Sequence, residues 1–441
     1  MEIRLGTKVN MIFIKVIVVG ILAFIMIIPI SMIRSLIMER EENQKNVQDD
    51  ISEKWGGSQH FTGPILVLPF EVEATSENSK PYMDKIYVLP NDFQVDGELV
   101  TEERSRTLFK TLVYQSNLKV SGKLSLPDYI GLEINPEKIH WQDTYVLIGV
   151  TFMQGIKNKI EFNVNGVPQK VLPGVKPNSI LSSGLTVNTP LDIAVENFDF
   201  DFNMVLNGSE GFYINPIGKT NRIQLKSAWN TVSFDGNYLP SERTIDKNGF
   251  DARWDVFDYN RNYVQSWTGE NAVLQSSSLG VDLKFSIDKY QMTMRSVKYA
   301  IMFIVLTFVV FFLVELLSKK RIHPVQYLLV SCALVLFYTL LLAISEHLSF
   351  GLSYLIAAFA TTALITAYST TMFKDIKQTT MMAIFLTVLY AYLYIILQQE
   401  NMALLFGAIG LFVALAIVMF VLRKVDWYKD ATDEKCNGRA M

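Results

Sequence analysis

Ionisable side chains at the ends of long apolar runs are the residues of this sequence best suited to chemistry. Glu315 stands near the end of one such run, and Lys319 follows four residues later. An ionisable residue at membrane depth is a default candidate for proton or ion handling. A glutamate placed four residues before a lysine on a helix also favours a local ion pair. We therefore interpret Glu315 as part of a snorkelling local pair rather than as a proton carrier.

Two further polar pairs lie at the ends of the next apolar run. Pro324 follows His323 at its start, and proline in the first helical position loses no hydrogen bond, so this pair predicts a helix cap. Glu346 and His347 end the run, where we expect a solvated helix end. His323 and Glu346 stand 23 residues apart, which is about 35 Å along a helix, the full thickness of a membrane. We predict two independent helix-end sites with mainly structural roles rather than a proton relay.

Motifs for known chemistries are missing from the sequence. It contains no phosphate-binding G-x-x-x-x-G-K-[ST], no G-x-G-x-x-G after a strand, no H-E-x-x-H, no G-x-S-x-G and no C-x-x-C. The four histidines are scattered without the spacing of zinc ligands. We therefore expect no enzyme, no catalytic residues, no cofactor and no metal site.

One acidic pattern allows a second interpretation. Asp199 and Asp201 alternate with phenylalanines, which places both carboxylates on one face of a strand. Such a face could bind calcium or a cationic ligand, but no loop of the D-x-D-x-D-G type accompanies it. We favour a solvated strand surface.

The elements that position these residues are membrane spans. A first apolar run, 16–33, follows Arg4, Lys8 and Lys15, and no cleavage site comes after it, so it predicts an uncleaved signal anchor kinked at Pro29. Five more spans are predicted towards the C-terminus, each near the twenty residues that a spanning helix needs. They cover 298–317, 325–344, 352–371, 379–397 and 403–422.

The short loops between these spans carry alternating charge. Lysine and arginine gather at 319–321, at 374–377 and at 423–424, whereas the turns at 345–347 and 398–401 have neither. The positive-inside rule therefore places both termini in the cytoplasm, and residues 34–295 on the outer side of the membrane. In a bacterium this side is the periplasm or the outer face of the membrane.

Charge and composition agree with a large outer domain. Residues 34–295 carry 26 of the 40 basic and 34 of the 43 acidic residues. This acidic balance excludes a nucleic-acid binder, which needs a basic excess. The outer domain contains no cysteine, so we expect it to fold without a disulfide.

Within the outer domain the spacing of apolar residues changes from that of a helix to a repeat of two residues. A charged helical stalk is expected over 35–56, ending at Trp55-Gly56-Gly57. Beyond it, apolar and polar residues alternate at 118–126, 160–164, 198–206 and 250–256, which predicts strands with one buried face. Five dipeptides predict turns: Asp96-Gly97, Asn165-Gly166, Asn207-Gly208, Asp235-Gly236 and Asn248-Gly249. The pattern favours an all-β, antiparallel sandwich, in one domain or in two with a seam near 168–190.

The fold class is therefore a polytopic α-helical membrane protein of six transmembrane helices, with a large all-β extracytoplasmic domain inserted between the first two. The expected divisions are the N-terminus with its anchor, the stalk, the β domain, a five-helix bundle and a cytoplasmic tail. Their bounds are 1–34, 35–56, 57–295, 296–422 and 423–441.

Several stretches resemble the CreD family of bacterial inner-membrane proteins, which are usually described as cell envelope integrity proteins. Among them are DKYQMTMRSVKYAI at 288–301, RIHPVQYLLV at 321–330 and LLLAISEH at 340–347. The H-P-x-Q-Y motif adds Gln326 and Tyr327 to the polar positions of interest. One departure is Val232, where the family tends to have proline. The resemblance implies an envelope protein that is often produced under a stress response, with no established reaction.

Three functions compete on this basis. We favour a non-enzymatic envelope-integrity protein of the inner membrane, whose β domain engages periplasmic or envelope proteins and whose helices contact the lipid bilayer. The alternative is a transporter or channel for a lipid or small amphiphile through the C-terminal bundle, which would need a polar path. An enzyme is the weakest possibility because its motifs are missing.

Overall fold

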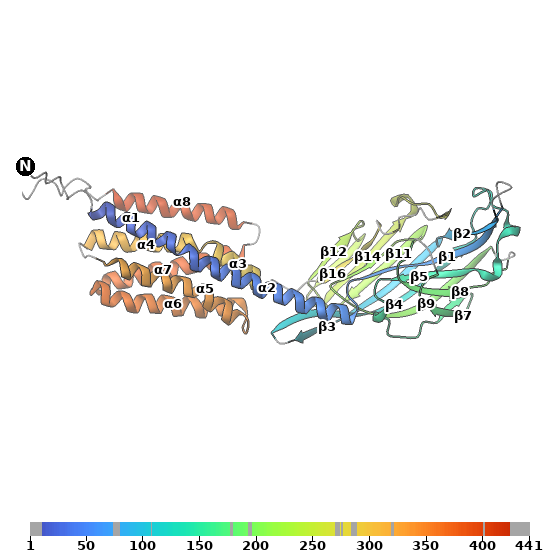
Figure 1. The fold of residues 1–441 in the computed structure, drawn as a ribbon, viewed down its shortest axis with the longest axis horizontal. Helices are drawn as coiled ribbons and strands as arrows, with labels where there is room; N and C mark the ends of the chain where they lie inside the picture. The colour runs from blue at the N-terminus through green and yellow to red at the C-terminus, as the bar shows by residue number, and fades with distance from the viewer. Residues whose placement is uncertain are drawn as a thin grey trace, which may run out of the picture. The chain divides into compact units, whose positions relative to one another are not determined.

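The computed structural model describes residues 11–73, 80–106, 108–176, 180–192, 196–269, 274, 277–283, 289–318, 322–399 and 402–423. The chain divides into two compact units. One, the helical unit, combines Met1–Asn43 with Ile287–Met441. The other, the β unit, comprises Gln44–Ser286. Figure 1 shows helices in the first unit and strands in the second.

The N-terminal apolar run forms two consecutive helices, α1 (Met11–Ile25) and α2 (Ile27–Trp55). They are separated at Met26 because Pro29 has no N–H to donate to the carbonyl of Ile25. The expected stalk is the second half of α2. It ends at Gly56 and Gly57, whose φ angles of 140° and 56° are unfavourable for other residues.

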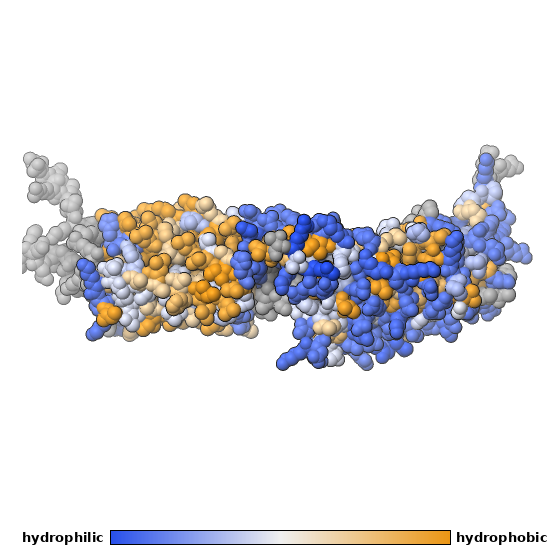
Figure 2. Space-filling model, turned by 90° about the horizontal axis from the view of Figure 1, so that it is seen from below, coloured by the Kyte–Doolittle hydropathy of each residue, from blue (hydrophilic) through white to orange (hydrophobic). Residues whose placement is uncertain are grey.

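The helices that follow the β unit in sequence form the rest of the helical unit. They are α3 (Lys289–Lys298), α4 (Ala300–Ser318), α5 (Pro324–Ser345), α6 (Phe350–Phe373), α7 (Ile376–Gln398) and α8 (Ala403–Leu422). α5 packs on α6, α6 packs on α7, and α1 packs on α4 and α5. The face of this unit seen in Figure 2 is mostly apolar.

Not every predicted span meets the length and hydropathy that a membrane crossing requires. Among the described residues, four helices do so when Ile14–Trp55, the described course of α1 and α2, counts as one, and there are five if α3 and α4, bent by 43°, also count as one span. The described apolar stretch of α8, Leu405–Phe420, is shorter. The structure thus supports a membrane protein with four or five apolar helices.

The expected boundary of the β domain at Arg295 is wrong. Residues from Lys289 onward are helical and belong to the helical unit. In α3, Met292 and Thr293 are buried together with Ser296 and Val297. This spacing of three to four residues is typical of a helix that is buried on one side. The prediction of a β domain up to residue 295 did not take this helical spacing into account.

The described part of the β unit contains sixteen strands. The first eight are β1 (Gln59–Val72), β2 (Tyr82–Val88), β3 (Asp92–Arg106), β4 (Phe109–Ser125), β5 (Tyr145–Val150), β6 (Phe162–Val164), β7 (Val167–Pro173) and β8 (Gly184–Asn188). The other eight are β9 (Asn197–Ser209), β10 (Gly211–Ile214), β11 (Thr220–Ser227), β12 (Val232–Gly236), β13 (Glu242–Asp246), β14 (Gly249–Phe257), β15 (Ser266–Thr268) and β16 (Leu279–Leu283).

The strands form one hydrogen-bonded path rather than two domains. Its order is β12-β16-β10-β1-β5-β8-β7-β6-β9-β4-β3-β11-β14-β13, while β2 pairs with β1 and β15 pairs with β2. The proposed seam at 168–190 is where β7 pairs with both β6 and β8 and joins the two halves. Two pairs of adjacent strands run parallel: β1 with β10, and β3 with β11. The expectation that the strands pair antiparallel is therefore wrong for these two pairs.

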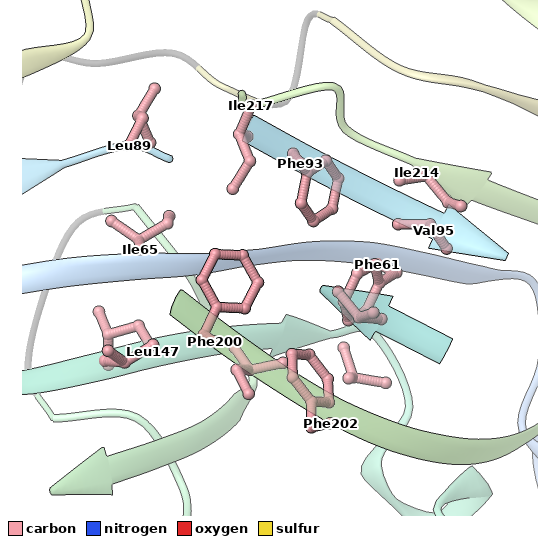
Figure 3. Close-up of a cluster of buried hydrophobic side chains, with 14 of the residues drawn as sticks. Phe61, Ile65, Leu89, Phe93, Val95, Leu147, Phe200, Phe202, Ile214 and Ile217 are labelled. Atoms are coloured by element: carbon pink, nitrogen blue, oxygen red, sulfur yellow. The ribbon is translucent and has the colours of Figure 1, made fainter. Parts of the chain in front are cut away.

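A single hydrophobic core fills the space between the two halves of the β unit. Figure 3 shows Phe61 and Ile65 of β1 facing Phe200 and Phe202 of β9, with Phe93 of β3 beside them. The alternating strand predicted at 198–206 supplies the buried residues Phe198, Phe200 and Phe202, each 2% exposed. Period-two alternation therefore located the core correctly.

The turn predictions were only partly correct. Asn165-Gly166 does form the β6–β7 hairpin with φ angles of 48° and 79°, as a type I′ turn requires. In contrast, Asn207-Gly208 lies within β9 and Asp96-Gly97 within β3. Gly208 is required for packing, because a Cβ there would lie 2.3 Å from the Tyr114 hydroxyl.

Candidate functional site

The carboxylate of Glu315 joins three segments of the helical unit. It accepts a hydrogen bond and forms an ion pair with Lys15 of α1. The backbone N–H of Ile322 donates to its Oε1 at 3.1 Å, and the Tyr327 hydroxyl donates to its Oε2 at 3.0 Å. Both carboxylate oxygens thus act as acceptors. We call these four residues the Glu315 cluster.

Aromatic packing shields this cluster. Tyr327 is 1% exposed, and the rings of Phe308 and Phe311 lie 5.5 and 6.1 Å from its ring. The Glu315 and Lys15 side chains are 11% and 20% exposed. Two opposite charges with so little water contact depend on each other, because either one alone would be costly to bury.

The start of α5 is capped next to this cluster. The His323 side chain accepts a hydrogen bond from the backbone N–H of Val325 through Nδ1 at 3.3 Å. The backbone N–H of His323 donates to Gln326 Oε1 at 3.0 Å. Pro324 occupies the first turn, as its position in the sequence predicted. His323, Pro324 and Gln326 thus fix where α5 begins, and Tyr327 follows in the position that reaches Glu315.

The opposite end of α5 has a second ion pair. The Glu346 carboxylate lies 3.6 Å from Nε of Arg40 in α2, and Lys289 Nζ of α3 donates to the Glu346 backbone carbonyl at 3.2 Å. The Glu346 side chain is 12% exposed, so the expectation of a solvated end is wrong for this residue. His347 beside it is exposed. We call Arg40, Lys289 and Glu346 the Glu346 cluster.

The structure brings Glu315 and Tyr327 together and keeps them apart from Glu346, as the helix length requires. Lys319, the expected partner of Glu315, lies outside the described residues. Sequence reasoning missed Lys15 and Arg40, and used Lys15 only as a marker of membrane orientation. A lone cation beside an apolar run was the available signal, because a charge at membrane depth needs a partner.

Between the two clusters the bundle is filled with aromatic rings. Phe337 and Tyr338 of α5 pack with Tyr354 of α6 and Tyr390 of α7, with ring separations of 4.7 to 5.5 Å around Phe337. The Tyr354 hydroxyl donates to the Tyr390 carbonyl at 2.7 Å, which satisfies a polar group in the interior. These described residues form an aromatic cluster in the interior of the bundle.

The β unit carries a polar row across β12, β16, β10 and β1. The Tyr213 hydroxyl donates to Asp282 and lies 3.5 Å from Asp235, and the His60 ring stacks on Tyr213 at 4.6 Å. Burial lowers the pKa of His60, and burial followed by the nearby Asp282 raises the pKa of Tyr213. Both groups are therefore neutral at pH 7.

Metal binding has little support among the described residues, where no group of three His, Cys, Asp or Glu side chains could hold an ion. In the Asp199–Asp201 pattern, Asp201 accepts a hydrogen bond from Asn163 at 2.9 Å. Asp199 lies 3.9 Å from Lys123 on the neighbouring strand. Both acids thus have partners on an exposed sheet surface.

Comparisons with known proteins agree with this architecture. The family model described as Inner membrane protein CreD matches residues 11–428. The inner membrane protein CreD of Escherichia coli (strain K12) is 30% identical over 416 residues, which cover 92% of this chain and 91% of that protein.

Similarity to solved structures is weak. An M1 zinc metallopeptidase from Deinococcus radiodurans is 10% identical, with a TM-score of 0.22 over 44% of this chain and 42% of that one. A point mutant of an M1 zinc metallopeptidase from the same organism, bound to a tripeptide substrate, is also 10% identical and gives a TM-score of 0.21 over the same shares of the two chains. Likenesses at this level carry no argument about fold or activity.

Proposed function

Because the chain belongs to the CreD family of inner membrane proteins, we propose that it is a non-catalytic envelope-integrity protein of a bacterial inner membrane. The observation that carries this proposal is the pair of ion-pair clusters at the two ends of α5. They attach α1 and α2, which precede the β unit in sequence, to helices that follow it. The arrangement suits a membrane scaffold that holds a large β unit by both of its ends.

We propose six spans with both termini in the cytoplasm and the β unit in the periplasm. The distribution of lysine and arginine in the short loops supports this orientation. In this arrangement the Glu315 cluster lies at the cytoplasmic surface and the Glu346 cluster at the periplasmic surface. Alkaline phosphatase fused after Gln378 should be inactive, and the same reporter fused after Asn401 should be active. The reverse pattern would contradict the orientation.

The β unit would supply the effector function by contacting envelope components, and periplasmic proteins are the expected partners. A chain in which a short flexible linker replaces 57–283 tests this assignment. We expect the shortened protein to insert, because its ion pairs are intact, but to lose envelope-stress tolerance. Retained tolerance would show that the β unit is dispensable and would contradict the proposal.

The transport alternative receives less support. A carrier for a lipid or amphiphile needs a polar or open path through its helices, whereas the described interior around Phe337 is packed with aromatic rings. A catalytic role also receives less support, because both carboxylates at the clusters are engaged in ion pairs and hydrogen bonds.

Charge reversal tests whether the ion pair at Glu315 underlies function. In a strain lacking the protein, Lys15→Glu and Glu315→Lys should each reduce tolerance to envelope stress at matched expression. Combining them should restore tolerance because the pair is re-formed with opposite polarity. Lys377→Glu is the control, since Lys377 is exposed and the change reverses one positive charge on the same side, as Lys15→Glu does. Full tolerance in both single variants, with normal insertion, would contradict a scaffold role for the pair.

A further inference from the structure

The edge strand β13 of the β unit is exposed along its whole length. It stands at one end of the hydrogen-bonded path of strands and, among the described strands, pairs only with β14. All five of its residues, Glu242–Asp246, are exposed. At the other end of the path, the first three residues of β12 are half-buried, and Arg243 stacks on the Phe234 ring at 5.7 Å. Of these two edges, that of β13 is therefore the more open to another chain.

The register of the β13–β14 hairpin shows which backbone groups face outwards. Asp246 pairs with Gly249 across a two-residue turn, and Ile245 pairs with Phe250. In an antiparallel ladder the pair that closes such a turn exchanges hydrogen bonds, and the next pair does not. Arg243 and Ile245 therefore direct their N–H and C=O groups away from β14, where no described residue bonds to them. An exposed row of this kind is a template for a further strand.

The side chains of β13 give this edge two different faces. Glu242, Thr244 and Asp246 share one face, because successive side chains of a strand alternate. Ile245 lies on the other face, opposite the buried Phe250, but is itself 47% exposed. A strand added at this edge would thus cover an apolar side chain on one face and meet two carboxylates on the other.

The two carboxylates favour a cationic partner. Glu242 and Asp246 form no ion pair within the described ranges, and Arg253, opposite Glu242, pairs with Asp255 instead. Opposite charges that face each other across two strands are favourable, and like charges are unfavourable. A second β13 in antiparallel pairing centred on Thr244 would place Glu242 opposite Asp246 twice. The edge therefore favours a different, basic segment over a second copy of this chain.

We propose that β13 is a docking edge for an extended, basic polypeptide segment of another protein, which adds to the sheet as an antiparallel strand. The backbone of that segment bonds to Arg243 and Ile245. Its lysine or arginine residues, four positions apart, face Glu242 and Asp246, and an apolar side chain covers Ile245. This inference deepens the proposed function, on which it rests for the role of the β unit, by naming the strand that receives a protein partner.

Peptide binding to the full-length protein tests the edge. The protein is held in phosphatidylcholine nanodiscs, with empty nanodiscs as the blank, and fluorescence anisotropy follows a labelled nine-residue peptide. In this peptide threonine and valine alternate, and lysine replaces the second and fourth threonines. We expect saturable binding that is lost when the backbone nitrogens of the two central valines are methylated, because these nitrogens donate to β13. The absence of saturable binding to the unchanged protein would overturn the proposal.

A matched pair of variants separates the backbone of β13 from its side chains. Ile245→Pro removes an outward N–H without breaking a bond to β14, and proline is tolerated at such edge positions. We expect it to weaken binding of the peptide by about tenfold. Ile245→Val keeps the N–H and the branched side chain and should bind as the unchanged protein does. Equal affinity in both variants would show that the edge is not used.

Charge reversal tests the recognition pattern without touching the backbone. Glu242→Lys combined with Asp246→Lys should weaken binding of the lysine peptide by about three to ten times and strengthen binding of the same peptide with glutamates in place of its lysines. Asp96→Lys combined with Glu98→Lys is the control. It makes the same change at exposed positions of β3, which is paired on both sides, and should alter neither affinity. Equal responses of the two double variants would indicate attraction by charge alone and would overturn the proposal.

Two further readouts separate this inference from its alternatives. A dimer of the unchanged protein that Ile245→Pro dissociates would show that the edge takes a second copy of this chain, which would overturn the proposal. Peptide binding is measured without envelope stress, so the docking edge and the proposed function can fail separately. Binding as expected, together with full stress tolerance after removal of 57–283, would retain the edge and reject the function.

Discussion

The helical unit and the β unit use charge in different ways. In the helical unit, Glu315 and Glu346 are 11% and 12% exposed, and each is paired with a cation about 300 residues away in sequence. In the β unit, pairs such as Lys110–Glu103 join exposed side chains on neighbouring strands, with exposures of 65% and 44%. Removing one partner from a pair with a mostly buried carboxylate is costly, because the other charge is left without compensation, whereas exposed pairs contribute little.

The difference follows from what holds each unit together. Strands of the β unit enclose a continuous apolar core, so the hydrophobic effect supplies most of its stability. Helices in a bilayer gain little from burying apolar side chains, since lipid is equally apolar, and depend on packing and polar contacts between helices. Ion pairs at the two ends of α5 therefore link helices of the helical unit, whereas phenylalanines fill the core of the β unit.

The largest expected effect is on the core of the β unit. Phe200→Ala removes a ring that is 2% exposed and stacks at 6.1 Å on Phe162. We expect the free energy of unfolding of this unit to fall by about 3–5 kcal/mol because a cavity remains. Denaturant unfolding followed by tryptophan fluorescence measures it, since five of the six tryptophans lie between residues 55 and 267. A loss below about 1 kcal/mol would contradict a tightly packed core.

A nearly equal effect is expected from breaking the Glu315 cluster. Glu315→Gln leaves the Lys15 charge without a partner, and we expect a loss of about 3 kcal/mol in unfolding of the helical unit, measured by titration with a denaturing detergent. Glu103→Gln in the β unit is the matched control and should cost less than about 0.5 kcal/mol. Equal losses in the two variants would remove the distinction between the units.

A smaller gain is expected at Glu210. This residue adopts a φ of 63° between β9 and β10, a conformation that glycine adopts without strain. Burial, with added repulsion from Asp49 and Asp282, also raises the pKa of its carboxyl. Glu210→Gly should stabilise the β unit by up to about 1 kcal/mol at pH 7, measured by denaturant unfolding. Because ionisation is disfavoured in the folded state, the gain should shrink as the pH falls towards 4, and a gain that grows instead would be inconsistent with this cause.

The smallest effect concerns His60. Burial lowers the pKa of this histidine from its ordinary value of 6.5, so the folded state favours the neutral ring. The contribution of His60 to the free energy of unfolding is therefore fully present above pH 6.5. This contribution declines as the pH falls below 6.5, because the histidine of the unfolded chain binds its proton at a higher pH than the histidine of the folded chain. His60→Gln should reduce the dependence of the unfolding temperature on pH between about pH 7 and pH 5. An unchanged pH profile in this variant would show that His60 does not contribute.

Local patterns explain why much of the fold was predictable. Apolar runs of spanning length located the helices, and period-two alternation identified β4, β9 and β14, because both signals depend on neighbours in the sequence. His323 and Pro324 marked the start of α5 for the same reason. Asp96-Gly97 failed as a turn signal, because the parallel pairing of β3 with β11 extends the strand through it.

The sequence by itself determined that this is a membrane protein with a large β unit, and it identified Glu315 and Glu346 as helix-end residues. Only the tertiary structure decided their partners, since Lys15 and Arg40 lie about 300 residues away and no local spacing encodes such a contact. Periodicity reflects the environment of each segment, whereas charge pairing depends on how distant segments are brought together.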